Sequence, residues 1–354
     1  MSQILQPNPL KFDNQVFDLA FHPQQNIIAS GLITGEIFCH RYFCETDAEN
    51  VNLLSIRPHK KSCRGLEFSY DGTALFSVSK DKSIQVIDLE TGKVLTKKRD
   101  AHDKPINCIL RLNENSLATG DDDGCIKIWD TRTGNQLMEY SDHEDFISDF
   151  SFRDDIKILV STSGDGTLSV YDIRKPNLLA MSDNQDDELL SVTVVKNGRK
   201  VITGTQDGVI NLFSWEKWGD SNDRIVGHPS SVDTIVKITE DLVCTGSSDG
   251  ILRVVEILPN KFHGVIGDHG DFPIECIRKS FDSTFLASCS HDNFVKFWDI
   301  RYLYEDKTDG HSDETDIKME SIDFDTDYNN KGKGKSMSTI GQSNNFFADF
   351  DTPP

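Results

Sequence analysis

Hydrophobic and polar positions recur along this chain in a regular pattern. Residues 117–120 form a mainly apolar run, an Asp-Gly turn follows at 123–124, and apolar and polar residues alternate from 125 to 130. This alternation predicts two β-strands joined by a tight turn, because Gly124 can adopt a positive φ while Ile126 and Ile128 point to one face. The segment therefore predicts a β-hairpin with one buried face.

The hairpin recurs along the chain with a nearly constant period. Its turn aspartates follow one another every 42 residues, except for a last step of 43, and a degenerate earlier copy has Thr34 and Gly35 at its turn. The aspartates are Asp81, Asp123, Asp165, Asp207, Asp249 and Asp292. A period in the low forties with four short strands per unit is typical of a β-propeller, in which neighbouring blades bury one another. The sequence predicts an all-β fold with seven blades.

The repeats resemble the WD-repeat (WD40) family. The pairs 129–130 and 298–299 are Trp-Asp, and a histidine lies 21 to 23 residues before most turn aspartates. The resemblance implies buried, structural hydrogen-bonded sets of His, Ser or Thr, Asp and Trp in two blades. These sets are His102, Thr119, Asp123 and Trp129, and His269, Ser288, Asp292 and Trp298. We expect Asp123→Ala to destabilise the fold, because a lost partner leaves a buried polar group at a cost of roughly 1–3 kcal/mol.

The repeats assign residues 1–304 to the propeller and residues 305–354 to a tail. After residue 299 the sequence offers no fourth strand for the last blade, so the segment from Ile4 to Phe12 is expected to supply it. The tail has twelve acidic residues, five lysines and few apolar residues, which predicts a disordered acidic segment. Its Phe-rich end, 345–350, is either a short docking motif or a chance cluster.

The charge of the chain restricts its partners. A net charge of −21 argues against direct binding to nucleic-acid phosphates and favours basic protein partners. The connections that precede the inner strands should share one rim of the disc with the turn aspartates. That rim is the candidate partner-binding surface, with ordinary solvated charge as the alternative. Its residues are Asp103, Glu144, Asp145, Asp187, Glu188, Asp271 and Phe272.

The sequence predicts no catalytic residues, cofactor or metal site. It contains no set of nucleophile, base and orienting group, and its eight cysteines lack a Cys-x-x-Cys spacing, as expected of buried thiols in a reducing compartment. No apolar run reaches the roughly 18 residues that span a membrane, and no signal peptide is visible, so a soluble intracellular protein is expected. Trp215 and Trp218 either anchor a partner or cap an outer strand.

Two functions follow from resemblance alone. An Arg two places after the Trp-Asp or Tyr-Asp pair occurs at Arg132, Arg174 and Arg301, and resembles the box by which WD-repeat substrate receptors dock on the adaptor of cullin-type ubiquitin ligases. The starts of the blades and the acidic tail resemble a nucleolar branch of the family. That resemblance implies a scaffold for large-subunit ribosome assembly and ribosomal RNA processing in the nucleus and nucleolus. The two roles are not exclusive.

Overall fold

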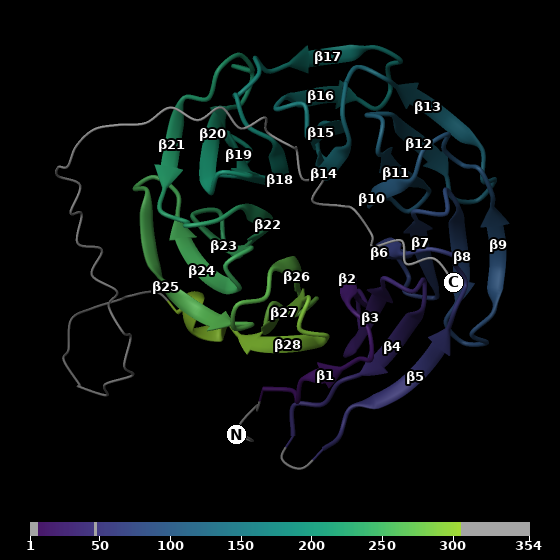
Figure 1. The fold of residues 1–354 in the computed structure, drawn as a ribbon. Coiled ribbons are helices and arrows are strands. Elements are labelled where there is room, and N and C mark those ends of the chain that lie inside the picture. Colours follow the sequence, from purple (N-terminus) through teal and green to yellow (C-terminus); the bar gives the residue numbers. More distant parts are fainter. Residues whose placement is uncertain (1–5, 46–47, 306–354) are drawn as a thin grey trace, which may run out of the picture. The chain divides into compact units, whose positions relative to one another are not determined.

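Seven antiparallel sheets of four strands surround a central axis (Figure 1). The computed structural model describes residues 6–45 and 48–305, so the predicted tail lies outside the described residues except for Glu305. The sheets are arranged like the blades of a propeller. The prediction of an all-β, seven-bladed propeller is confirmed.

Each blade runs from an inner strand at the axis to an outer strand at the circumference (Figure 1). Blades one and two are β2 (Val16–Phe21), β3 (Ile27–Leu32), β4 (Ile37–Arg41) and β5 (Val51–Ile56), then β6 (Cys63–Phe68), β7 (Ala74–Ser79), β8 (Ile84–Asp88) and β9 (Val94–Lys98). Blades three and four are β10 (Ile106–Asn113), β11 (Ser116–Asp121), β12 (Ile126–Asp130) and β13 (Gln136–Tyr140), then β14 (Ile147–Arg153), β15 (Ile158–Ser163), β16 (Leu168–Asp172) and β17 (Leu178–Met181). Blades five and six are β18 (Leu189–Val195), β19 (Lys200–Thr205), β20 (Val209–Ser214) and β21 (Asp223–Val226), then β22 (Val232–Lys237), β23 (Leu242–Ser247), β24 (Ile251–Glu256) and β25 (Lys261–Asp268).

The last blade takes strands from both ends of the described chain. It consists of β26 (Ile274–Lys279), β27 (Phe285–Ser290), β28 (Phe294–Asp299) and β1 (Leu10–Lys11), and a short 3₁₀ helix, η1 (Arg301–Leu303), follows it. β1 pairs antiparallel with β28, and the Phe12 N–H extends the pairing by donating to the Asn293 carbonyl over 2.9 Å. The N-terminal segment is therefore the outer strand that joins blade seven to blade one.

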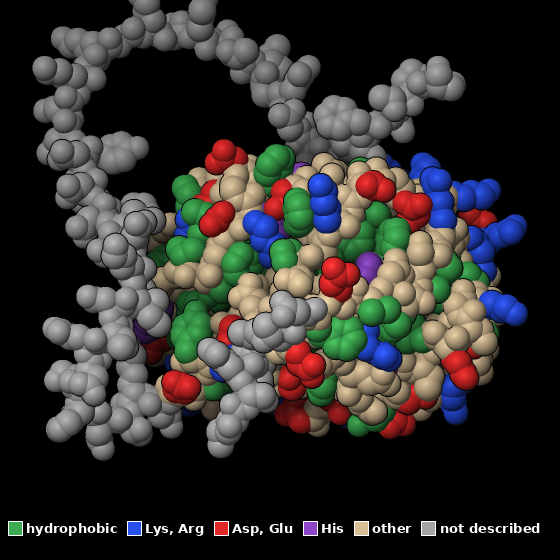
Figure 2. Space-filling model, turned by 90° about the horizontal axis from the view of Figure 1, so that it is seen from below, with side chains coloured by type: hydrophobic (Ala, Val, Ile, Leu, Met, Phe, Trp, Pro, Cys, Tyr) green, Lys and Arg blue, Asp and Glu red, His purple; other side chains and the backbone are tan. Residues whose placement is uncertain are grey.

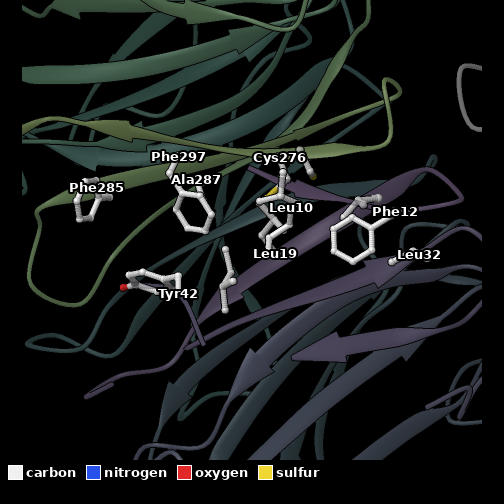
Figure 3. Packing of buried hydrophobic residues seen from close by; sticks show 13 residues of the cluster. Leu10, Phe12, Leu19, Leu32, Tyr42, Cys276, Phe285, Ala287 and Phe297 are labelled. Atoms are coloured by element: carbon white, nitrogen blue, oxygen red, sulfur yellow. The ribbon is translucent and has the colours of Figure 1, made fainter. Parts of the chain in front are cut away.

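Buried apolar side chains hold this closing strand in place. Leu10 and Phe12 are each only 6% exposed, within a cluster drawn from blades one and seven. Figure 3 shows Leu10 close to Leu19 and Cys276, and Phe12 beside Leu32. The closing strand forms few backbone hydrogen bonds, so we infer that side-chain burial contributes most of its attachment.

Every inner strand carries a β-bulge near its start. Its first and third residues pair with consecutive residues of the second strand, so that the second residue is extra in all seven blades. A bulge redirects the side chain of the extra residue. The extra residues are Phe17, Arg64, Asn107, Ser148, Leu190, Asp233 and Glu275. Most of them are polar, and two are acidic.

Two of the turns adopt a left-handed backbone without glycine. Lys82 and Asn293 stand where most blades have Gly, and both have a φ of 66°. For a residue with a Cβ atom this conformation costs roughly 1–2 kcal/mol, and less for Asn. The turn geometry is thus kept in every blade although its sequence varies.

Helices long and apolar enough to cross a membrane are absent from residues 6–45 and 48–305.

Candidate functional site

The hydrogen-bonded set of blade three is complete, but its aspartate differs from the predicted one. His102 Nδ1 donates to Asp121 Oδ2 over 2.8 Å, and Thr119 Oγ1 donates to His102 Nε2 over 2.7 Å. Trp129 Nε1 donates to the same Thr119 oxygen over 2.8 Å. The predicted Asp123 is instead exposed and forms a surface ion pair with Lys104. The assignment of Asp123 to this set was therefore wrong, and Asp121 takes its place.

The other predicted set has the expected contacts. His269 Nδ1 donates to Asp292 Oδ2 over 2.7 Å, and Ser288 Oγ donates to His269 Nε2 at the same distance. Trp298 Nε1 donates to Ser288 Oγ over 2.7 Å. In blade four, His143 bonds to Asp165 in the same way over 2.8 Å. These bonds join the connection before an inner strand to the turn between the second and third strands, so both lie on one rim of the disc, the turn rim.

Asp121 ends the second strand, at the position that Ser163 occupies in blade four. Burial alone would raise the pKa of Asp121, but hydrogen bonds from His102 and from the Cys125 N–H overcome it and lower that pKa. A carboxyl group whose folded pKa is lowered stabilises the fold above its unfolded pKa of about 4, and this contribution is lost as the pH falls through the folded value.

Replacing Asp121 and Asp123 one at a time by Ala separates their roles. We expect Asp121→Ala to lower the free energy of unfolding by about 1–3 kcal/mol at pH 7, because it leaves His102 Nδ1 buried without its acceptor. Asp123→Ala should change the free energy by less than about 0.5 kcal/mol, because it removes only an exposed ion pair. Urea unfolding of both variants measures the difference, and equal effects would contradict the assignment.

Blades five and six depart from the shared set. In blade six, Arg253 binds Asp249 through two bonds of 3.0 and 2.6 Å, so the aspartate is not available to His228. Burial and the charge of Arg253 lower the pKa of His228 to about 4, and its Nδ1 has no partner among the described residues. Blade five lacks the histidine, and there Asp187 accepts from the Asp207 N–H over 2.9 Å.

The predicted acidic residues lie on the turn rim. Asp103, Glu144, Asp145 and Asp271 are exposed, Asp187 and Glu188 are half-buried, and Phe272 is 50% exposed. We call these seven residues the acidic rim. Burial raises the pKa of Glu188, and the nearby charges of Asp145 and Asp187 raise it further. The carboxylates of blades four and five therefore crowd one another and repel.

Sequence reasoning missed further acidic groups at the starts of two inner strands. Asp233 and Glu275 are extra residues of the inner-strand bulges, and Ser248 of a rim turn donates to Asp233 over 2.8 Å. Burial and the charge of Glu275 raise the pKa of Asp233 to about 7. Glu275 binds His291, whose pKa it raises. The signal was an acidic residue at the second position of an inner strand, directly after the apolar Val232 or Ile274.

Charged side chains of the inner strands of several blades also interact with one another. Arg278 of β26 donates to Asp18 of β2 over 2.9 Å, and Asp18 also accepts from the Leu66 N–H of β6 over 2.7 Å. Burial raises the pKa of Glu67 to about 7, against the charges of Arg111 and Arg278, and that of Asp149 to about 6, against the Val192 N–H and the charge of Arg278. Arg278 thus influences carboxyl groups from three other blades.

Three possible metal ligands come close together, but the set does not fit an ion. His102, Asp121 and Cys125 are the one such group within residues 6–45 and 48–305. His102 already has a hydrogen bond at each ring nitrogen, and Asp121 accepts from His102 and two backbone N–H groups. Burial, followed by the charge of Asp121, raises the pKa of Cys125 to about 11, so the thiol keeps its proton at neutral pH. The group belongs to the fold.

The three arginines considered for ligase docking share one local geometry. Arg132, Arg174 and Arg301 each bind the aspartate two positions earlier in the chain, at the end of a third strand. Their side chains remain 69%, 63% and 40% exposed, respectively. The strand ends that carry them lie opposite the turn rim. Adaptor docking through these residues stays a prediction.

The two tryptophans of blade five pack onto the protein. Trp215 and Trp218 are partly buried against the apolar cluster of blades four and five, with their rings edge to face at 5.0 Å. The Arg153 guanidinium lies 4.6 Å from the Trp215 ring. Of the two alternatives, this geometry fits the capping of an outer strand.

Comparison with known proteins places this architecture in one family. A profile of the WDR55 family matches residues 7–303. The chain is 41% identical to WD repeat-containing protein 55 of Mus musculus over 297 residues, which cover 84% of this chain and 76% of the mouse protein. Identity to the Arabidopsis thaliana protein of the same name is 40% over 290 residues, which cover 82% of this chain and 81% of that protein. WD repeat-containing protein JIP5 of Coprinopsis cinerea is 42% identical over 308 residues, covering 84% and 75% of the two chains.

Proposed function

Because the chain belongs to the WDR55 family of WD-repeat propellers, we propose that it is a non-catalytic scaffold that binds basic proteins on its acidic rim. We place this role in ribosome biogenesis, in large-subunit assembly and ribosomal RNA processing within the nucleus and nucleolus. Propellers of this kind present rigid surfaces for protein–protein interaction. The resemblance of the blade starts and of the acidic tail supports the cellular process.

The crowding of carboxylates on blades four and five supports this proposal most directly. Burial raises the pKa of Glu188, and the charges of Asp145 and Asp187 raise it further, so the free protein holds these like charges together at an energetic cost. A Lys or Arg side chain placed between them would relieve the repulsion. Phe272, half exposed on the same rim, offers an apolar contact beside the charges. Ribosomal proteins and many assembly factors are basic and have the complementary charge.

Neutralising the crowded carboxylates tests the proposal. We expect Asp145→Asn/Glu188→Gln to reduce recovery of large-subunit assembly factors about tenfold in affinity purification from nuclear extract at about 0.1 M salt. Recovery with the unmodified protein should fall as salt increases. Mass spectrometry identifies the bound proteins.

A matched variant controls for loss of net charge. Glu114→Gln/Glu216→Gln removes two exposed carboxylates from the loops opposite the turn rim and should leave recovery unchanged. If the unmodified protein recovers no assembly factors at low salt, the assignment to ribosome biogenesis fails. If both double variants lose binding equally, the acidic rim is not the site.

A further inference from the structure

Blade two differs in charge from the rest of this acidic chain. Between residues 57 and 104, blade two and its flanking connections carry eleven Lys and Arg against seven Asp and Glu, although the whole chain has a net charge of −21. Figure 2 shows Lys and Arg side chains gathered at one end of the disc, on the side where β9 lies in Figure 1. One blade thus presents positive charge in an acidic protein.

We propose that a strip of this blade binds an extended, acidic segment of a partner protein. The basic strip consists of Arg57, Lys60, Lys61, Lys97 and Arg99, with Leu95 two residues before Lys97 on β9. Its chemistry is opposite to that of the acidic rim, so the inference goes beyond the proposed function and does not depend on it. The two surfaces would let one propeller hold partners of opposite charge.

The cations of the basic strip are brought together by the fold and are not neutralised. Lys97 Nζ donates to the Pro58 carbonyl over 3.1 Å, which joins the end of β9 to the connection that carries Arg57, Lys60 and Lys61. All five cationic residues are exposed, and none forms an ion pair with a carboxylate in the described part of the chain. The strip therefore keeps its charge available for a ligand.

An apolar side chain lies beside these charges on β9. Leu95 is the extra residue of a bulge in β9 and is 61% exposed. Val94, next to it, is 41% exposed. Exposed apolar groups between cations suit a peptide that combines acidic with apolar side chains, and add nothing to the binding of a bare phosphate chain.

The backbone of β9 can receive an extended segment. It is the outer strand of its sheet, and four of its five residues are exposed, a larger fraction than in any other outer strand described. Its outer edge has no strand partner among the described residues. Lysines on an edge strand prevent pairing with an identical edge, because like charges would meet. An acidic strand meets no such barrier, so the strip favours addition of an acidic strand to the sheet.

The surroundings of the strip disfavour nucleic acid. Binding of single-stranded nucleic acid usually adds aromatic stacking to phosphate contacts, whereas the strip contains no aromatic residue. Beyond the strip a long polyanion would meet exposed carboxylates, including Asp100, Asp103 and Asp123. A short acidic peptide of about ten residues would fit within the positive region.

Direct binding of a synthetic peptide tests the proposal. The probe is a fluorescent ten-residue peptide of alternating Glu and Leu, measured by anisotropy with the full-length protein at about 0.05 M salt. We expect Lys60→Glu/Lys61→Glu to weaken binding by at least about tenfold, and the affinity to fall with added salt. Leu95→Ser should weaken binding about threefold without changing the salt dependence, because it removes only apolar contact.

Controls distinguish the possible occupants. Lys217→Glu/Lys261→Glu reverses two exposed lysines outside blade two and should not change binding, while unchanged melting temperatures show that the variants are folded. The proposal fails if the peptide does not bind, or if both double variants bind equally weakly. It also fails if a 20-nucleotide RNA binds more tightly than the peptide and loses binding in the Lys60/Lys61 variant. Peptide binding seen only after removal of residues 306–354 would identify the chain's own tail as the occupant and overturn an external partner.

Discussion

Replacing both Leu10 and Phe12 by Ala is expected to lower the free energy of unfolding by about 4–10 kcal/mol. Each side chain is 6% exposed in the cluster between blades seven and one, and truncation of buried Leu or Phe typically costs about 2–5 kcal/mol. The sum is comparable to the whole stability of many domains. Deletion of residues 1–14 should have at least this effect, because it also removes the pairing of β1 with β28.

Urea unfolding followed by tryptophan fluorescence measures this effect. Lys11→Ala is the matched control, because Lys11 lies between the two apolar residues and is exposed, with its Nζ 5.8 Å from the Phe294 ring. Loss of that contact should cost less than about 1 kcal/mol. If the double variant is as stable as Lys11→Ala, closure of the ring does not depend on the N-terminal segment.

Arg278→Met is expected to destabilise the propeller more at high pH than at low pH. The guanidinium binds Asp18 and opposes the raised pKa of Glu67 and Asp149. Loss of one partner of a buried pair can cost several kcal/mol. Because 42% of the Arg278 side chain is exposed, solvent screening reduces our expectation to about 1–3 kcal/mol at pH 8.

The direction of the pH dependence follows from the raised pKa values. Glu67 and Asp149 hold their protons in the folded protein up to about pH 7 and pH 6, whereas their unfolded values are near 4. Their contribution therefore favours the folded state below pH 4 and is lost as the pH rises through 6 to 7. Removing Arg278 raises both values further, so most of the additional loss should occur above pH 7.

Urea unfolding at pH 5 and pH 8 provides the comparison. Lys237→Met is a suitable control, since Lys237 forms a surface ion pair with Glu240 and its loss should cost less than about 0.5 kcal/mol at either pH. Equal destabilisation by Arg278→Met at both pH values would show that the charge of Arg278 does not affect the pKa values of Glu67 and Asp149.

The period of the chain was sufficient to predict the architecture. Apolar alternation and turn residues report local structure, and a fixed spacing of 42 residues leaves few ways to bury the faces of the strands. The same regularity misled the prediction for blade three. The period aligns Asp123 with Asp165, but the carboxylate that reaches His102 belongs to Asp121, two residues earlier. Spacing predicts where a turn lies, but not which neighbouring side chain reaches the buried partner.

Features that depend on contacts between blades could not be predicted from the repeat. Arg278 and Asp18 are 260 residues apart in sequence, and nothing local to either residue indicates the other. Asp233 and Glu275 depart from the regular alternation of their strands, because each is the extra residue of a bulge. The acidic rim could be predicted, because its connections precede inner strands in every blade, whereas the crowding of Glu188 required the three-dimensional arrangement.

The pairing of β1 with β28 also affects how the protein is made. Leu10 is synthesised early and its partner Val295 late, so at typical translation rates of about 5–20 residues per second the ring stays open for roughly 15–60 s. Meanwhile the apolar surfaces of the first blade face solvent at the ribosome. We expect the nascent chain to need a chaperone during this interval, until translation of the last blade allows the two ends to meet.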